Sequence, residues 1–196
     1  MNGALLAFNP EAEGTGGARL LFGVTLAPRT SIRWISPLEE LDLASHFLEA
    51  RAKDRMAVLL AHIIRRAGTI VGRPVSPAIE AALLRKLAQS AAVVHSALRL
   101  RDSAAGYPMS AGAIFGAELE GLSAEDREFE AARRFVRFAE EVAGAAARAA
   151  PGVNPGATAE RAERLAARRL APGLARAVAT LPIGFRARRP MRPSHS

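Results

Sequence analysis

The sequence contains no cysteine among its 196 residues, and this absence excludes several kinds of protein at once. Disulfide-stabilised folds, cysteine nucleophiles and cysteine-ligated metal sites are all ruled out. Lysine is also scarce, with two lysines against 25 arginines. Because alanine is abundant as well, this bias is typical of GC-rich codon usage. The arginine content by itself therefore does not indicate RNA binding.

Long hydrophobic runs are missing too. Nowhere does the chain contain the roughly eighteen consecutive apolar residues of a membrane span. The first residues, MNGALLAFNPE, lack the basic start and the long apolar stretch of a secretory signal. The hydrophobic content of 49% is enough to bury one core without disulfides. We therefore expect a cytoplasmic protein with no transmembrane segment.

The stretch from Leu122 to Arg148 has the clearest pattern in the chain. At about 100° per residue its apolar side chains fall on one half of a helix, and three of the eight phenylalanines lie on that half. Each buried aromatic side chain stabilises a fold by roughly 2 kcal/mol or more. We expect this helix to organise a core through Phe129, Phe135, Val136, Phe138 and Val142.

The other half of the same helix carries charged side chains, which predicts a face in contact with solvent. Ser123 is a suitable N-cap for its start. Glu130 precedes Arg134 by four residues, and Arg137 precedes Glu141 by four. This spacing favours weak ion pairs within the helix.

Capping signals predict three helices upstream. Ser36 followed by Pro37 begins a helix that extends to about residue 50. Asp54 is a suitable N-cap for a second helix, which two arginines and Gly68 would end. Pro77 begins a third, which runs to about residue 100. All three have apolar residues at helical spacing, as expected in a bundle.

Downstream, Thr158 is the expected N-cap of a helix that runs to about Leu170, and residues 174–181 add about two turns. The fold class is therefore predicted to be all-α, a bundle of about five amphipathic helices over residues 36–181. Residues 1–35 form an irregular segment, either a small hairpin or a disordered tail. Residues 182–196, with three prolines and four arginines, are predicted to be a disordered basic tail.

The positive charge is concentrated at one end of the chain. Residues 158–196 contain nine arginines and two glutamates, a net charge of +7, whereas the other 157 residues contain 18 basic and 17 acidic side chains. A C-terminal basic arm of this kind is a candidate for polyanion binding. Its candidate residues are Arg168, Arg169, Arg176, Arg186, Arg188, Arg189 and Arg192.

Two stretches carry a resemblance to other proteins. FGAELEGLSAEDREFEAARRFVRFAEE at residues 115–141, with the APGL at 171–174, resembles an uncharacterised bacterial protein family with an "LEGLS-ED-EFE-A-FVRFA" signature. Residues 38–73 are similar to that family's acidic helix and "RRAG..VGRP" segment. The likeness covers about two thirds of the chain, but residues 75–112 contain less glycine than the family's apolar centre. The resemblance implies no activity and no catalytic residues.

Motifs for catalysis are absent from the sequence. The four histidines occur in no HExxH context, and no G-x-S-x-G turn is present. We therefore expect no enzyme, no catalytic residue, no metal site and no cofactor. The favoured function is a structural or adaptor protein that contacts a protein partner through its helices, with the basic arm as an auxiliary. The alternative is polyanion binding by that arm, to nucleic acid or to an anionic membrane surface.

Overall fold

The computed structural model describes residues 35–99, 109–117, 119, 121–150 and 152–179, and all regular structure among them is helical. This confirms the predicted all-α bundle, with five long helices and two short ones in the described ranges. The predictions for residues 1–34 and 182–196 lie outside the described residues. The helices are α1 (Pro37–Glu49), α2 (Lys53–Val71), α3 (Pro77–Arg99), α4 (Ala111–Phe115), α5 (Ala124–Ala147), α6 (Pro155–Leu170) and α7 (Leu174–Ala179).

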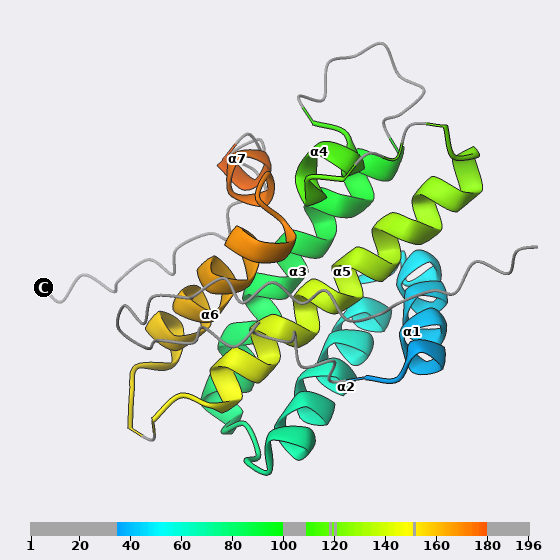
Figure 1. Ribbon diagram of the computed structural model, residues 1–196. Coiled ribbons are helices and arrows are strands. Elements are labelled where there is room, and N and C mark those ends of the chain that lie inside the picture. The colour runs from blue at the N-terminus through cyan, green and yellow to red at the C-terminus, as the bar shows by residue number, and fades with distance from the viewer. Residues whose placement is uncertain (1–34, 100–108, 118, 120, 151, 180–196) are drawn as a thin grey trace, which may run out of the picture. The chain divides into compact units, whose positions relative to one another are not determined.

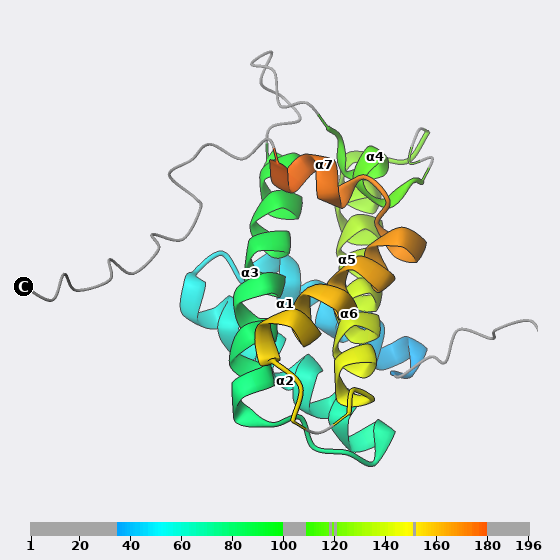
Figure 2. The ribbon, with the colours of Figure 1, turned by 90° about the vertical axis from the view of Figure 1, so that its left-hand side faces the viewer.

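Helix α5 is the common packing partner of the other long helices (Figures 1 and 2). It packs against α1, α2, α3 and α6, and twelve of its 24 residues are buried. So much burial exceeds the single stripe of an ordinary surface helix. The expectation that its charged half meets solvent was wrong, because α1 covers Arg133 and Arg137. These two arginines bind α1 rather than water alone.

A cluster of phenylalanines joins α1 to α5. Phe47 of α1 stacks on Phe135, with 4.4 Å between ring centroids, and Phe138 lies 6.3 Å from Phe135. All three side chains are fully buried. Phe129, one turn from the start of α5, is only partly buried against this core. The fully buried members of the predicted core set are Phe135, Val136, Phe138 and Val142.

Two predicted helix starts are present in the structure. The backbone N–H of Glu39 donates to Ser36 Oγ at 3.2 Å, and Pro37 occupies the first turn of α1. At the start of α5 the N–H of Asp126 donates to Ser123 Oγ at 3.1 Å. Local sequence decides these ends because the cap and the amide it satisfies are three residues apart.

The predicted caps of α2 and α6 were wrong. Helix α2 begins at Lys53, so Asp54 lies in its first turn and no side chain caps it. Helix α6 begins at Pro155, and Asn154 Oδ1 accepts a hydrogen bond from the backbone N–H of Ala157 at 3.1 Å. Thr158 is already inside α6. The Asn-Pro pair is the stronger signal, because proline has no amide to satisfy at the first helical position.

Helix α2 also continues beyond its predicted end. Gly68 lies inside the helix, which ends at Gly72 with a φ of 70°. A Cβ on Gly68 would lie 3.0 Å from the carbonyl oxygen of Arg73 and 3.3 Å from Val75. Gly68 therefore allows the following loop to fold back closely on the helix, whereas Gly72 supplies the left-handed conformation that ends it.

Within the described ranges, no helix is both long enough and apolar enough to cross a membrane. This agrees with the expected lack of a transmembrane segment in that part of the chain. The cytoplasmic location stays a prediction.

Candidate functional site

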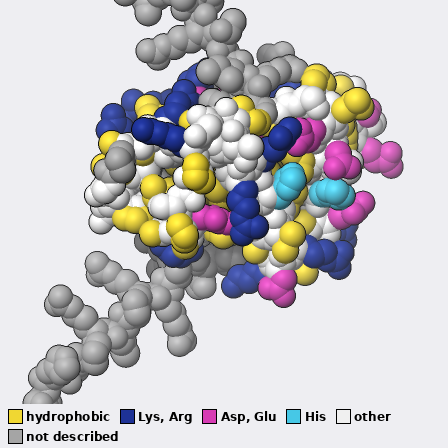
Figure 3. Space-filling view, turned by 90° about the horizontal axis from the view of Figure 1, so that it is seen from below, with side chains coloured by type: hydrophobic (Ala, Val, Ile, Leu, Met, Phe, Trp, Pro, Cys, Tyr) yellow, Lys and Arg dark blue, Asp and Glu magenta, His cyan; other side chains and the backbone are white. Residues whose placement is uncertain are grey.

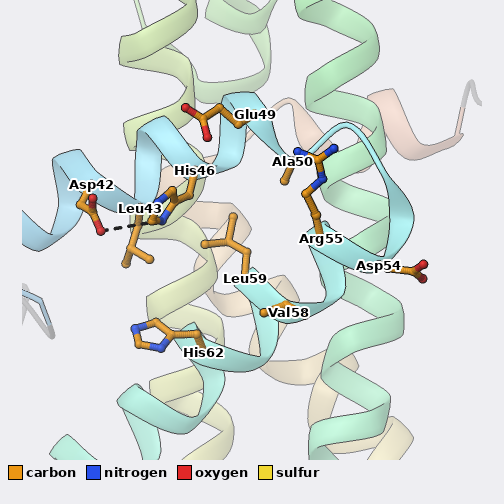
Figure 4. Close-up of a pocket in the computed structure, with 10 residues that line it drawn as sticks. All are labelled: Asp42, Leu43, His46, Glu49, Ala50, Asp54, Arg55, Val58, Leu59 and His62. Carbon is orange, nitrogen blue, oxygen red and sulfur yellow. Dashed lines mark ion pairs between the residues drawn. The ribbon is translucent and has the colours of Figure 1, made fainter.

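Helices α1 and α2 diverge from the short turn that joins them, and an open groove lies between them (Figure 4). Both helices pack on α5 far more than on each other, which keeps them apart. The groove has a volume of about 520 Å³. Its lining residues are Asp42, Leu43, His46, Glu49 and Ala50 from the α1 side, and Asp54, Arg55, Val58, Leu59 and His62 from α2.

The floor of the groove is apolar. Leu43 and Leu59 are almost completely buried and face the space between the two helices (Figure 4). Val58, one residue before Leu59, is 71% exposed and lines the groove. An apolar side chain from another segment would remove Val58 from water on entering this groove.

The rim is acidic. Asp42, Glu49 and Asp54 supply three carboxylates against the single guanidinium of Arg55, so the lining has a net charge of −2 when its histidines are neutral. Glu49 and Asp54 are exposed and form no ion pair with any other described residue. Figure 3 shows histidine, acidic and hydrophobic side chains gathered on one part of the face seen there. The groove thus combines an apolar floor with unpaired negative charge.

The two histidines of the groove lie on opposite walls. His46 of α1 places Nδ1 3.7 Å from Asp42 Oδ2, and His62 projects from α2 (Figure 4). In the part of the chain that the structure describes, no cluster of three or more histidine and acidic side chains has the geometry to hold a metal ion. The polar groups of the groove are therefore best suited to hydrogen bonds and charge contacts.

Helix α1 is fixed in place by a buried carboxylate. The Glu40 side chain is only 5% exposed, and its Oε1 accepts a hydrogen bond from Arg133 Nε at 2.9 Å. Burial alone would raise the pKa of the Glu40 carboxyl, but the hydrogen bonds and charges of Arg137 and Arg133 outweigh it and lower this pKa below its ordinary 4.5. Glu40 is therefore ionised at neutral pH, and the wall of the groove that α1 forms is anchored to α5.

A histidine lies behind the same wall. The ring of His95, from α3, stacks on Phe47 with 4.3 Å between centroids. Its Nε2 is buried and has no hydrogen-bond partner. Burial, with the charges of Arg99 and Arg51, lowers the pKa of His95 below its ordinary 6.5, although a hydrogen bond to the backbone of Phe47 opposes the shift. His95 is therefore a neutral packing group, whereas His62 is exposed.

The arginines predicted from sequence lie on other elements. Arg168 and Arg169 are exposed near the end of α6, and Arg176 is exposed on α7. Arg169 Nη1 binds Glu141 Oε1 of α5 at 2.8 Å, so this arginine ties α6 to the bundle. Arg168 and Arg176 form no ion pair with any other described residue. Arg186, Arg188, Arg189 and Arg192 lie outside the described residues.

Sequence reasoning missed the groove residues, although a signal was present. Asp42, His46 and Glu49 are spaced by four and three residues, which places them on one face of α1. Asp54, Val58 and His62 repeat at intervals of four along α2. Only the crossing of α1 and α2 on α5 brings the two faces together.

In comparisons with known proteins, no family model, no curated protein and no solved structure matches the chain. The resemblance to an uncharacterised bacterial family stays a prediction.

Proposed function

We propose that this protein is a non-enzymatic adaptor that binds a protein partner in the groove between α1 and α2. The partner contributes a basic segment that also carries apolar side chains. One observation supports this proposal above all others: the exposed Val58 lies over a floor of Leu43 and Leu59, beside the unpaired carboxylates of Glu49 and Asp54.

The two parts of the groove have separate roles in this proposal. An apolar side chain of the partner packs on Val58 and Leu59, and its burial supplies most of the affinity. Arginine or lysine side chains next to it meet Glu49 and Asp54. These exposed charges accelerate association and select basic partners, and both effects weaken as salt rises.

Binding of a synthetic peptide tests this proposal. The probe is a fluorescent 15-residue peptide with four arginines and two phenylalanines, titrated with the full-length protein. We expect saturable binding that Val58→Ser weakens about fifteenfold, since roughly two methyl groups of contact are lost at about 0.8 kcal/mol each. Val153→Ser is the matched control, because Val153 is 44% exposed but lies in the turn before α6.

The charge contribution has its own variants. Glu49→Gln with Asp54→Asn removes two groove carboxylates, and we expect a lower association rate and a smaller dependence on salt. Glu125→Gln with Glu160→Gln removes two exposed carboxylates elsewhere on α5 and α6 and serves as the control. Equal effects of the two double variants, or no binding by the wild type, would contradict the proposal.

Polyanion binding remains a second candidate, favoured by one feature of α6 and α7. Arg161, Arg168 and Arg176 are exposed and form no ion pair with any other described residue. These three guanidinium groups of the C-terminal basic arm can each contact a phosphate. Later in the sequence, Arg186, Arg188, Arg189 and Arg192 add four more positive charges to the arm.

Salt titration separates this candidate from the adaptor. Binding to duplex DNA and to anionic vesicles is measured separately between about 50 and 200 mM salt. For DNA, Arg168→Ser with Arg176→Ser should lower the slope of log K against log salt by about two. An unchanged affinity, or no binding by the wild type at about 150 mM salt, would remove this candidate.

A further inference from the structure

We propose that, in the absence of a partner, the groove between α1 and α2 holds this chain's own C-terminal basic segment, residues 182–196. This inference rests on the proposed function, because it assumes that the groove accepts basic segments with apolar side chains. The segment would then compete with the partner for the groove.

The composition of the segment matches the groove. Residues 182–196, PIGFRARRPMRPSHS, contain four arginines and no acidic residue, together with Phe185 and Met191 as large apolar side chains. The groove offers a net charge of −2 on its rim and an apolar floor. Met191 stands next to Arg192, so one apolar contact and one charge contact can form within two residues.

Other exposed acids in the described part of the chain are less suitable. Glu39 binds Arg66 at 3.1 Å, and Glu80 binds Arg65 at 3.0 Å, so these carboxylates are already neutralised. Glu125 lies in the first turn of α5, where the helix dipole stabilises its charge. The groove combines unpaired carboxylates with an apolar floor.

The length of the chain after α7 is sufficient to reach the groove. Helix α7 ends at Ala179 and packs on α3, and α3 also carries His95, which stacks on Phe47 of α1. Phe185 is six residues after Ala179 and Met191 is twelve residues after it, so at about 3.3 Å per residue they can lie up to roughly 20 Å and 40 Å from the end of α7. For comparison, α3 with its 23 residues is about 34 Å long at 1.5 Å per residue.

Tethering makes even a weak contact effective. A segment joined to its site by a short flexible linker has an effective concentration of about 1 mM. Suppose that the segment binds the groove with a Kd of about 100 μM, roughly a tenth of this effective concentration. A competitor added in solution would then bind the intact protein about tenfold more weakly than it binds a variant whose segment cannot enter the groove. Weak self-binding is then sufficient to select against weak partners.

The test uses a fluorescent synthetic peptide of residues 182–196 and the full-length chain. The variant carries Arg186→Ser, Arg188→Ser, Arg189→Ser and Arg192→Ser, and we expect it to bind the peptide about tenfold more tightly than the wild type does. Adding Val58→Ser to this variant should abolish most of the gain. The control changes Arg161, Arg164, Arg168 and Arg176 to serine, which removes four positive charges from α6 and α7 and should leave the peptide affinity near the wild-type value.

The outcomes distinguish this inference from the function on which it rests. Equal peptide binding by the wild type and the four-serine variant would overturn self-occupancy while leaving the groove as a binding site. Absence of binding by both proteins would overturn the proposed function as well. A gain that survives Val58→Ser would place the segment on another surface and overturn the inference. The inference would also be overturned if the wild type formed a concentration-dependent dimer and the four-serine variant did not. In that case the segment would occupy the groove of a second copy of the chain.

Discussion

Arg137 of α5 and Glu40 of α1 form a two-point ion pair across the helix interface. Arg137 Nε donates to Glu40 Oε2 at 2.8 Å, and its Nη2 donates to Oε1 at 2.8 Å. This parallel geometry is the strongest that a guanidinium and a carboxylate can form. Because hydrogen bonding to Glu40 raises the pKa of Arg137, the arginine stays charged throughout the accessible pH range. The pair fixes the position of α1, and with it one wall of the groove.

Removing the Glu40 charge should loosen this wall. Glu40→Gln removes the carboxylate that Arg137 binds at two points and leaves Arg133 paired only with Glu130, in a site where the side chains of Arg133 and Arg137 are 29% and 32% exposed. Loss of one partner of a fully buried pair costs about 3 to 5 kcal/mol, and the partial exposure of the arginines reduces this to roughly 2 to 3 kcal/mol. Urea unfolding monitored by circular dichroism measures the loss.

Glu39→Gln is the matched control for that variant. The Glu39 side chain is the immediate neighbour of Glu40 and pairs with Arg66, which is 44% exposed. An exposed pair contributes about 0 to 1 kcal/mol, so this substitution should change stability little. Equal losses in the two variants would show that Glu40 has no special role in holding α1.

The phenylalanine cluster should dominate the stability of the bundle. Phe135→Ala with Phe138→Ala removes two fully buried rings, one of which stacks on Phe47. Each substitution costs about 3 to 5 kcal/mol, against a total of about 5 to 15 kcal/mol. We expect the double variant to lose its cooperative thermal transition. Phe129→Ala, at a partly buried position on the same helix, should retain it.

Close packing at the turn before α7 gives a further prediction. Gly173 donates its N–H to the carbonyl oxygen of Ile114 at 3.0 Å. A Cβ at Gly173 would overlap the Ala113 carbonyl oxygen and lie 2.9 Å from Ile114 Cα. Gly173→Ala should therefore cost about 1 to 3 kcal/mol through displacement of α4 and α7. Gly156→Ala meets only the side chain of Asn154 and should stay within about 0.5 kcal/mol of the wild type.

His95 should make stability depend on pH. Its pKa is lower in the folded protein than its ordinary 6.5, so below pH 6.5 the unfolded chain takes up a proton that the folded chain does not. Unfolding free energy should therefore fall as pH drops from 6.5 toward the folded pKa, by at most about 1.4 kcal/mol per pH unit. Glu40 acts in a separate window, because its contribution is present above pH 4.5 and is lost at lower pH.

Urea titrations of the wild type and His95→Phe at pH 7.0 and 5.5 check this dependence. The phenyl ring can keep the stack on Phe47 but cannot take up a proton. We expect a smaller loss of stability between the two pH values in His95→Phe than in the wild type. The same loss in both proteins would show that His95 does not carry this effect.

The sequence by itself determined which segments become helices and where several of them begin. Apolar spacing of about 3.6 residues requires only local geometry, and caps such as Ser36 and Ser123 lie three residues from the amides they satisfy. The same local information placed Phe135 and Phe138 on the face that became the core. It was misleading at Asp54 and Thr158, because α2 begins without a side-chain cap and Asn154 caps α6 four residues before Thr158.

Only the tertiary structure decided what the polar faces do. The charged half of α5 reads as a solvent face, but Glu40 lies 97 residues before Arg137, and no local pattern connects them. The groove arises in the same way, because Glu49 and Val58 face each other's helix only after α1 and α2 have both packed on α5. A helical period fixes which residues share a face. Which other helix covers that face depends on the total burial that the whole chain can achieve.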